Sequence, residues 1–374
     1  MPIFCFESPD PDTLFVRGLQ NIIQGQMADS LIIQDSRNGP VFRMPGVTVT
    51  EHKNPRDRVL FNAVRDSNPF FSVFESLWML SGRNDVDLPA KFASQIREYS
   101  DDGKTLNGAY GHRWRRHFGH DQLMIAASEL RRDPMSRRVN IQMWDGKQDV
   151  ELLTGPGSKD LPCNLSMVMV NTEGRLDLTV FNRSNDLIWG AWGANLVHFA
   201  FVQEFVAQLA GLEVGTYYQV SSNTHIYSEF PITKRLLEPV ENDRKIKFGV
   251  RPEVAAGLDT RPEFILSPKI LEDNILQVSH TIWEFTRNLD KFFFEFGIMN
   301  EYTDLGANTI SPFLREVAEP MRRAWNLYKA DKLEEAVALL EGHPNYDWLV
   351  NSRQWLERRI ESRAAKADTA ATSQ

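Results

Sequence analysis

Apolar positions recur along the chain with two periods, one typical of strands and one typical of helices. Within the first 50 residues, short apolar runs at 31–33 and 47–49 alternate with turn residues at 37–40 and 45–46, which predicts strands and a hairpin. Farther along the chain, strands of the core are predicted at residues 139–144, 165–170, 176–181 and 217–220. The pattern therefore gives the chain a substantial β component.

Helical spacing marks most of the remaining segments. Residues 70–80 form a dense apolar run that ends at Ser81-Gly82, as a buried helix with a glycine stop would. Residues 195–209 repeat apolar side chains at helical spacing, and Gly211 stands where a C-terminal cap belongs. Two more helices are predicted at residues 266–300 and 313–340, where the aromatic side chains suit core or dimer packing. Because no repeat and no long linker divides the chain, we expect one domain with appendages.

Composition narrows the class of protein. The 374 residues are 42% hydrophobic and 25% charged, as in an ordinary globular protein. A net charge of −8 argues against a broad grip on nucleic acid, although a local basic pocket could still hold one phosphate. No apolar stretch is long enough to cross a membrane and the N-terminus lacks a leader pattern, so we expect a cytoplasmic protein, in the host cytoplasm if the chain is viral.

The chain has only two cysteines, so we predict neither a disulfide framework nor a metal site. Cys5 is interpreted as a small hydrophobic residue without a chemical role. The residues next to Cys163, taken alone, allow the same interpretation for that cysteine. The sequence around Cys163 also holds Arg137-Arg138 and Arg183-Ser184. Cations near a thiol lower its pKa, and arginines with a serine hydroxyl make a phosphate cradle. These residues favour a phosphorylated substrate presented to a thiolate.

The order and spacing of several motifs resemble the thymidylate synthase and pyrimidine hydroxymethylase family over roughly residues 30 to 230. The motifs are Asp133-Pro134-x-Ser136-Arg137-Arg138, Leu161-Pro162-Cys163, Arg183-Ser184-x-Asp186-x-x-x-Gly190 and Thr224-His225-Ile226-Tyr227. Two earlier segments are also similar, namely Glu75-Ser76-Leu77-Trp78-x-Leu80-x-Gly82 and Asn107-Gly108-x-Tyr110-Gly111-x-x-Trp114. A single cysteine or a doubled arginine would be a weak signal, whereas motifs in this order are a strong one.

The resemblance implies a homodimeric α+β fold, in which helices surround a large mixed β-sheet that packs at the dimer interface. On this basis we expect a catalytic domain over residues 1–265 and a helical extension over 266–362. Residues 363–374 are mostly small and polar with almost nothing to bury, which predicts a disordered tail.

The resemblance also implies a chemistry. Cys163 would attack C6 of a pyrimidine deoxynucleotide, which makes C5 nucleophilic toward a one-carbon unit from 5,10-methylenetetrahydrofolate. The catalytic set would further include Glu75 as a general acid or base acting through water, Tyr110, and Asp186, which orients the folate. Gly190 and Tyr99 would lie on the cofactor side. Without the motif pattern, Glu75 would read as a buried structural acid.

Matching positions likewise imply a nucleotide site. The phosphate would be held by Arg183 and Ser184, with Arg37 as a further ligand, and by Arg137 and Arg138 from the partner subunit. His225 and Tyr227 would hold the ribose 3′-hydroxyl. Without the other motifs, His225 would be interpreted as a histidine of the core, and Arg137-Arg138 as part of a solvent-exposed surface.

Asn195 matches the family's base-reading position if residues 190–194 contain one inserted residue relative to the family. Without that insertion, Ala194 matches the position. An amide can donate to O4 and accept from N3–H of uracil, which favours dUMP ahead of dCMP.

Several departures collect around the folate side. Asn164 stands where thymidylate synthases usually have histidine, Asn185 resembles the hydroxymethylase branch, and Ile96 and Tyr99 replace two tryptophans. We also find no short apolar segment after Tyr227 that would close the site. Hydride transfer needs water excluded, whereas hydroxymethylation needs water admitted. We therefore predict hydroxymethylation.

Three alternatives stay open. The nearest is a thymidylate synthase that closes its site with an unfamiliar C-terminal element. Another is a silent nucleotide-binding scaffold, against which the intact Cys163 and Glu75 argue. The third is a methyltransferase that uses another donor on the same nucleotide, for which the altered folate positions are the only support.

Overall fold

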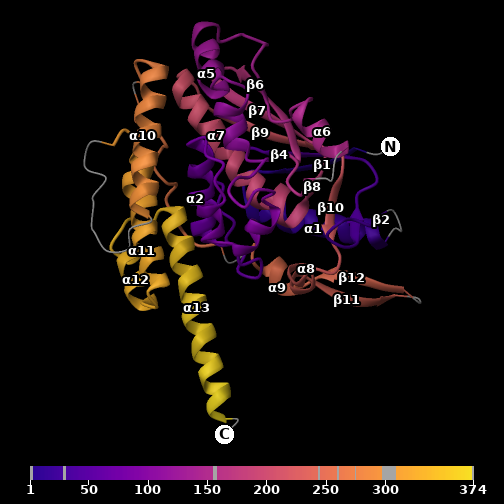
Figure 1. Cartoon of the computed structure of the whole chain (residues 1–374). Coiled ribbons are helices and arrows are strands. Elements are labelled where there is room, and N and C mark those ends of the chain that lie inside the picture. The colour runs from indigo at the N-terminus through magenta and orange to yellow at the C-terminus, as the bar shows by residue number, and fades with distance from the viewer. Residues whose placement is uncertain are drawn as a thin grey trace.

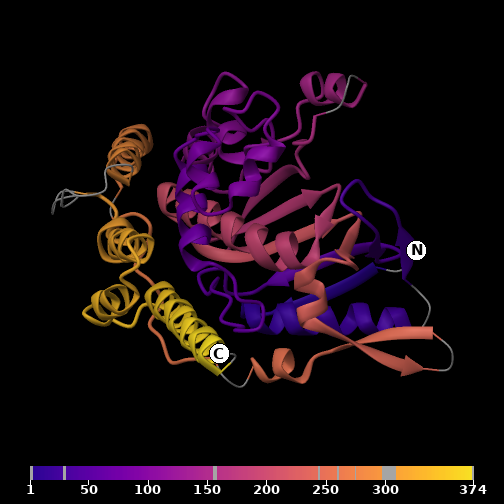
Figure 2. The same ribbon diagram turned by 60° about the horizontal axis from the view of Figure 1, so that its bottom comes forward.

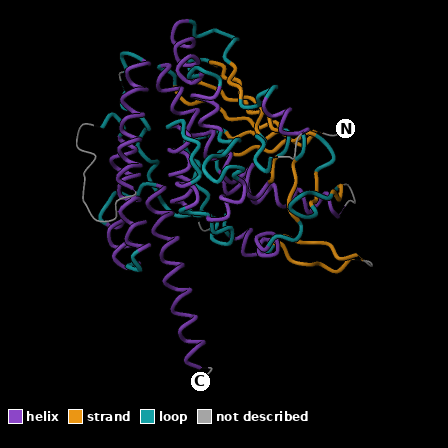
Figure 3. Tube along the Cα trace, in the orientation of Figure 1, coloured by secondary structure: helices purple, strands orange, loops and turns teal. Residues whose placement is uncertain are grey.

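The computed structural model describes residues 3–27, 31–154, 158–242, 245–258, 261–273, 275–296 and 309–372. Strands gather in one part of the molecule, and helices lie around them and extend to one side (Figure 3). This mixture of a large sheet with many helices confirms the predicted α+β class.

The main sheet is mixed and has six strands in the order β1-β4-β9-β7-β6-β5. Its strands are β1 (Ile3–Ser8), β4 (Val47–His52), β9 (Glu213–Ser221), β7 (Arg175–Asn182), β6 (Asn164–Thr172) and β5 (Asn140–Gln142). Neighbouring strands are parallel between β1 and β4 and between β7 and β9, and antiparallel elsewhere. The predicted strands are thus confirmed, although β5 is shorter than the expected 139–144.

A smaller sheet has the order β2-β3-β10-β8. Its strands are β2 (Ile32–Gln34), β3 (Val41–Arg43), β10 (Thr224–Tyr227) and β8 (Asn185–Asp186). The predicted hairpin is confirmed, since β2 and β3 are antiparallel and the turn between them carries Arg37 and Gly39, the latter at a φ of +111°. The parallel pairing of β10 with β8 places His225 beside Asp186.

Helix α2 (Pro69–Leu80) and helix α7 (Asn195–Ala210) confirm the two central helix predictions. The Asn68 side chain caps the start of α2 by accepting the N–H of Phe71 at 3.2 Å. Beyond their C-terminal ends, Gly82 and Gly211 have φ values of +73° and +76°, which other residues rarely adopt.

The first 50 residues also contain a helix that the pattern did not predict, α1 (Pro11–Met27). Its buried side chains Leu14, Phe15, Leu19 and Ile22 have helical spacing, yet the polar residues between them weaken the periodic signal. The predicted strands and hairpin of this region are thus present, and α1 is an element that the prediction lacked.

The C-terminal helices differ from the prediction in their boundaries. They are α10 (Val278–Phe296), η4 (Leu314–Ala318), α11 (Glu319–Lys329), α12 (Leu333–Glu341) and α13 (Asp347–Thr372). The first begins twelve residues later than expected, and residues 297–300 of that prediction lie outside the described residues. The predicted helix 313–340 is interrupted at Asp331, whose φ of +67° no α-helix accommodates.

The predicted disorder of residues 363–374 is also wrong for the described part of the tail. Helix α13 continues to Thr372, and its final turns project beyond the rest of the molecule (Figure 1). Residues 361–369 are exposed, but alanines favour helix and the preceding turns are already anchored by burial, so elongation costs little. Residues 373–374 lie outside the described residues.

Shorter elements connect these parts. The helical ones are α3 (Asp87–Ala90), η1 (Ser94–Tyr99), α4 (Tyr110–His112), η2 (Arg113–His117), α5 (Gln122–Arg132), α6 (Gln148–Thr154), η3 (Leu187–Ala194), α8 (Pro231–Leu236) and α9 (Pro252–Ala256). A hairpin of β11 (Leu237–Asn242) and β12 (Lys245–Val250) extends from the body, as seen in two orientations (Figures 1 and 2). Among the helices that the structure describes, none combines the length and apolarity needed to cross a membrane.

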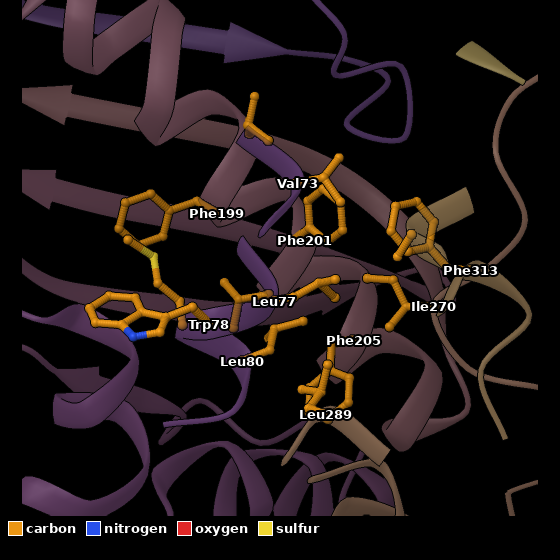
Figure 4. Packing of buried hydrophobic residues seen from close by; sticks show 14 of the residues in the cluster. Val73, Leu77, Trp78, Leu80, Phe199, Phe201, Phe205, Ile270, Leu289 and Phe313 are labelled. Carbon is orange, nitrogen blue, oxygen red and sulfur yellow. The ribbon is translucent and has the colours of Figure 1, made fainter. Parts of the chain in front are cut away.

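One hydrophobic cluster joins the main sheet, α2, α7 and the C-terminal helices. Figure 4 shows side chains of α2 and α7 close to three residues from the C-terminal part, Ile270, Leu289 and Phe313. Burial of these side chains ties the C-terminal helices to the rest of the chain. The domain boundaries at residues 265 and 362 stay a prediction.

Candidate active site

Cys163 directly precedes β6 and is half-buried. Its backbone N–H donates to the hydroxyl oxygen of Tyr110 at 3.1 Å, and the N–H of Asn164 donates to the same oxygen at 3.3 Å. Tyr110 begins α4, where its segment is packed closely enough that a Cβ on Gly111 would lie 2.0 Å from the Met79 carbonyl oxygen. The structure therefore joins two of the predicted catalytic residues by a direct hydrogen bond.

Two arginines flank the loop that leads to Cys163. The Arg183 side chain donates to the carbonyl oxygens of Pro162 at 2.8 Å and Leu161 at 3.1 Å, and its backbone N–H donates to the Cys163 carbonyl at 3.0 Å. Arg37, from the tip of the β2–β3 hairpin, donates to the Lys159 carbonyl at 2.9 Å. Both arginine residues are exposed, so they combine a fixed position with access to an anion.

The charged residues around Cys163 shift the pKa of its thiol in opposite directions. Burial raises the pKa of the Cys163 thiol, the positive charges of Arg183 and Arg37 lower it, and the negative charge of Asp160 raises it further. Asp160 is held by the Gly108 N–H at 2.8 Å, and a side chain at Gly108 would collide with its carboxylate. The sequence interpretation passed over Asp160, whose signal was its place three residues before the cysteine.

Glu75 projects from α2 toward α7, where its Oε2 lies 3.1 Å from Nε2 of His198. His198 is buried and lies one helical turn after Asn195, on the same face of α7. The interpretation of the sequence missed this histidine because it stands inside a continuous apolar run. The pair can hold or pass on a proton.

Asn195 begins α7, and its amide meets two other buried amides. Its Nδ2 donates to Oδ1 of Asn185 at 3.0 Å, and its Oδ1 accepts from Nδ2 of Asn164 at 3.3 Å. The preceding η3 is a π-helical segment with non-helical backbone at Trp192 and Gly193, which absorbs the extra residue. The structure thus brings Asn195, rather than Ala194, to the neighbour of Cys163.

Asp186 caps the start of η3 by accepting the Trp189 N–H at 2.5 Å. Burial raises the pKa of Asp186 to about 7, although the charge of Arg65 lowers it. Its Oδ2 is buried and has no hydrogen-bond partner among the described residues, while the neighbouring Trp189 is 48% exposed. The unpartnered Asp186 oxygen and the exposed Trp189 ring are the groups on this segment that could hold a flat, polar cofactor. Trp189 was not singled out in the sequence.

The other two residues expected on the cofactor side are placed differently. A Cβ on Gly190 would lie 2.6 Å from Oδ1 of Asn185, so close packing alone accounts for glycine there. Tyr99 ends η1 and is 38% exposed. A cofactor role for either residue stays a prediction.

His225 and Tyr227 both lie on β10, with ring centroids 5.4 Å apart. Nδ1 of His225 lies 3.1 Å from the Asn223 side-chain oxygen, and burial lowers the pKa of His225. Burial raises the pKa of Tyr227, and the negative charges of Asp186 and Cys163 raise it further. The pairing of β10 with β8 places the segment with these two candidate ribose ligands beside Asn185 and Asp186. Ser184 is half-buried beside Arg183.

Arg137 and Arg138 lie apart from this cluster. Both are exposed in the loop before β5, where Arg138 pairs with Glu129 at 3.1 Å. The following Val139 accepts the N–H of Met169 on β6, six residues beyond Cys163. At about 3.3 Å per strand residue, this places the doubled arginine roughly 20 Å from the thiol of its own chain.

Comparison with known proteins shows the family of the chain. The family model described as thymidylate synthase matches residues 65–251, half of the chain. The chain belongs to the thymidylate synthase family. A solved thymidylate synthase from T4 phage aligns with a TM-score of 0.50 and 18% identity, covering 75% of this chain and 90% of that one. Family membership confirms the predicted fold and the predicted class of enzyme, a one-carbon transferase.

Two phage proteins are similar to larger parts of the chain than the family model matches. A deoxyuridylate hydroxymethyltransferase of Pseudomonas phage M6 is 40% identical over 351 residues, which cover 91% of this chain and 93% of the relative. A protein of the same name from Bacillus phage SP01 is 34% identical over 65% of this chain and 63% of its own. The first similarity extends through most of the C-terminal helices, beyond the thymidylate synthase match.

Proposed function

We propose that the protein transfers a hydroxymethyl group to C5 of dUMP, with dCMP as the next candidate substrate. The observation that carries this proposal is the 40% identity, over nearly the whole chain, to a protein named deoxyuridylate hydroxymethyltransferase. The arrangement around Cys163 supports it, because a thiol, an exposed arginine and a buried amide lie together there. The absence of paired cysteines and the phage relatives fit a cytoplasmic reaction, in the host cell if the chain is viral.

In this proposal Cys163 forms a covalent bond to C6 of the pyrimidine. Addition of the thiolate makes C5 an enolate-like nucleophile, and loss of the C5 proton later allows the thiolate to leave. Because burial raises the pKa of the free thiol, the cation of Arg183 favours the reactive thiolate as well as the substrate phosphate. Tyr110 fixes the backbone at the nucleophile, and Ser184 and Arg37 complete the phosphate contacts from this subunit.

The folate side of the site would be held by Asp186, whose free Oδ2 can accept from the pterin, with Trp189 and Tyr99 as exposed aromatic surfaces. When bound, 5,10-methylenetetrahydrofolate supplies the one-carbon unit. Glu75 and His198 would move protons through water at C5 and at the new hydroxymethyl group. Water must reach the site for this product, and α13 projects away from the sheet instead of covering it (Figure 1).

The proposal includes a homodimer. One face of the main sheet is packed under α7, whereas the other face exposes apolar side chains such as Val47, Val170 and Phe181 at 37%, 42% and 38%. An exposed apolar sheet face of this kind is typical of a subunit interface. A partner on this face could present its Arg137 and Arg138 to the phosphate at Cys163, which the same chain cannot do.

Product analysis tests the proposal. The purified protein is incubated with 5,10-methylenetetrahydrofolate and either dUMP or dCMP, and the nucleotides are identified by mass spectrometry. A 5-hydroxymethyl nucleotide together with tetrahydrofolate is the expected result. Formation of the 5-methyl nucleotide with dihydrofolate would instead make the protein a thymidylate synthase.

Two control reactions separate the remaining alternatives. With dUMP tritiated at C5, binding without tritium release would identify a silent scaffold. Product formed with the folate omitted would identify a methyltransferase that uses another donor.

A further inference from the structure

A directed chain of hydrogen bonds connects the protein backbone to Asn195. The carbonyl oxygen of Ala191 accepts from Nε2 of Gln219 at 2.7 Å. Oε1 of Gln219 accepts from Nδ2 of Asn185 at 3.1 Å, and Oδ1 of Asn185 accepts from Nδ2 of Asn195 at 3.0 Å. Gln219 and Asn185 are each 2% exposed and Asn195 is 8% exposed, so water does not compete for these bonds.

The chain has a direction because it begins at a backbone carbonyl. A carbonyl oxygen can only accept, so Gln219 must turn its NH₂ toward Ala191 and its oxygen toward Asn185. Asn185 must then offer its NH₂ to Gln219 and its oxygen to Asn195. Turning over any one amide would set oxygen against oxygen or N–H against N–H in a buried place, which is costly.

Packing supports the same orientation of Asn185. Its Oδ1 occupies the space that a Cβ on Gly190 would need, with only 2.6 Å between them. Its Nδ2 also donates to Oγ of Ser221 at 3.0 Å. A hydroxyl can donate or accept, so Ser221 tolerates either orientation of Asn185 and cannot set the direction by itself. The amide of Gln219 is therefore the directing group.

The orientation of Asn195 matters because an amide can suit either base. With its NH₂ on one side, an asparagine donates to O4 and accepts from N3–H of uracil. Turned over, the same side chain accepts from the amino group and donates to N3 of cytosine. With one N–H on Asn185, Asn195 turns its other N–H and its oxygen toward Asn164, whose Oδ1 and Nδ2 lie at 3.5 and 3.3 Å. This edge of Asn195 carries a donor beside an acceptor, the pair of groups that uracil requires in place of Asn164.

We propose that Gln219 and Asn185 determine base specificity by locking the amide of Asn195 in the uracil-reading orientation. This inference rests on the proposed function, in which Asn195 reads the base. Gln219 and Asn185 are positioning residues here, since they act through Asn195. The position of the Asn195 amide alone would not exclude cytosine. Cytosine is excluded by the buried chain of hydrogen bonds from Ala191 through Gln219 and Asn185 to Asn195, which we call the relay.

The test is the ratio of kcat/KM for dUMP to kcat/KM for dCMP. In Gln219→Leu nothing fixes which side of the Asn185 amide faces Asn195, so Asn195 can also turn over to suit cytosine. The ratio should therefore fall by roughly tenfold or more. The matched control is Gln203→Leu, since Gln203 is also buried and donates to the carbonyl oxygens of Leu176 and Thr216, outside the relay. General loss of folded enzyme lowers both rates and leaves the ratio unchanged.

A second pair of variants covers poor folding of Gln219→Leu. Asn185→Asp keeps an acceptor beside Asn195, so this variant should still prefer dUMP. Asn185→Leu removes that acceptor, so this variant should no longer prefer dUMP. An unchanged ratio in both leucine variants would overturn the relay. If the wild-type enzyme turns over neither nucleotide, the proposed function fails, and the ratio of dUMP to dCMP dissociation constants in the same variants still decides the relay.

Discussion

The hydroxyl oxygen of Tyr110 accepts the backbone N–H of Cys163 at 3.1 Å, so the tyrosine holds the nucleophile through its main chain. It also accepts the next N–H, from Asn164. Burial raises the pKa of the Tyr110 hydroxyl well above its usual value, which keeps it a neutral group. A substitution at Tyr110 therefore acts on the position of the thiol without touching the phosphate or the base.

Tyr110→Phe should lower kcat for dUMP by roughly 10- to 100-fold, because two backbone N–H groups lose their acceptor at about 1–3 kcal/mol. The dissociation constant for dUMP should change little. Steady-state kinetics and calorimetry measure the two effects. Tyr346→Phe is the matched control, since that hydroxyl donates to Glu316 in the C-terminal helices. A Tyr110→Phe enzyme with wild-type kcat would contradict the positioning role.

Cys163→Ala should lower turnover at least about a thousandfold and spare dUMP binding, because the covalent step is lost while the phosphate and base contacts remain. Cys5→Ala, which replaces the exposed cysteine of β1, should leave turnover unchanged. Product formation and nucleotide titration are measured for both variants. An active Cys163→Ala enzyme would remove the nucleophile assignment.

Arg183→Ala should weaken dUMP binding by roughly 10- to 100-fold through loss of charge-assisted bonds to the phosphate. It should also move thiol reactivity to higher pH, since the arginine lowers a pKa that burial has already raised. Alkylation of Cys163 by iodoacetamide as a function of pH, in the Cys5→Ala background, reports the shift. Arg175→Ala, at the exposed far end of β7, is the control. Unchanged dUMP affinity in Arg183→Ala would reject the phosphate role.

A mixture of two inactive variants should recover activity if the site is shared between subunits. One variant is Cys163→Ala and the other carries Arg137→Ala with Arg138→Ala. A heterodimer of the two has one site with both defects and one site with none, so random reassociation should restore about a quarter of wild-type activity. No recovery after verified subunit exchange would place the arginines outside the partner's site.

Much of the fold could be predicted from local pattern. Strands such as β6 and β7 alternate cleanly, and α2 and α7 carry continuous apolar runs that end in a glycine with positive φ. Helix α1 could not be predicted in this way, because it becomes stable by packing its apolar stripe on other segments. A Cβ on Gly18 would lie 1.6 Å from the ring of Trp192, which shows how closely they meet.

The candidate site was predictable where motifs carried it and not where contacts form across the fold. Cys163, Arg183 and Asp186 stand in recognisable runs of sequence. His198, Gln219 and Trp189 do not, since each owes its place to a residue far along the chain or to the π-helical turn of η3. A buried glutamine in a strand looks unfavourable until its hydrogen-bond partners are known.

The central claim is that the transferred one-carbon unit ends as an alcohol whose oxygen comes from water. The most direct measurement is to run the reaction of dUMP and 5,10-methylenetetrahydrofolate in H₂¹⁸O and to determine the product mass. We predict a 5-hydroxymethyl nucleotide that carries one ¹⁸O on the new carbon. A 5-methyl nucleotide free of ¹⁸O, formed together with dihydrofolate, would contradict the account.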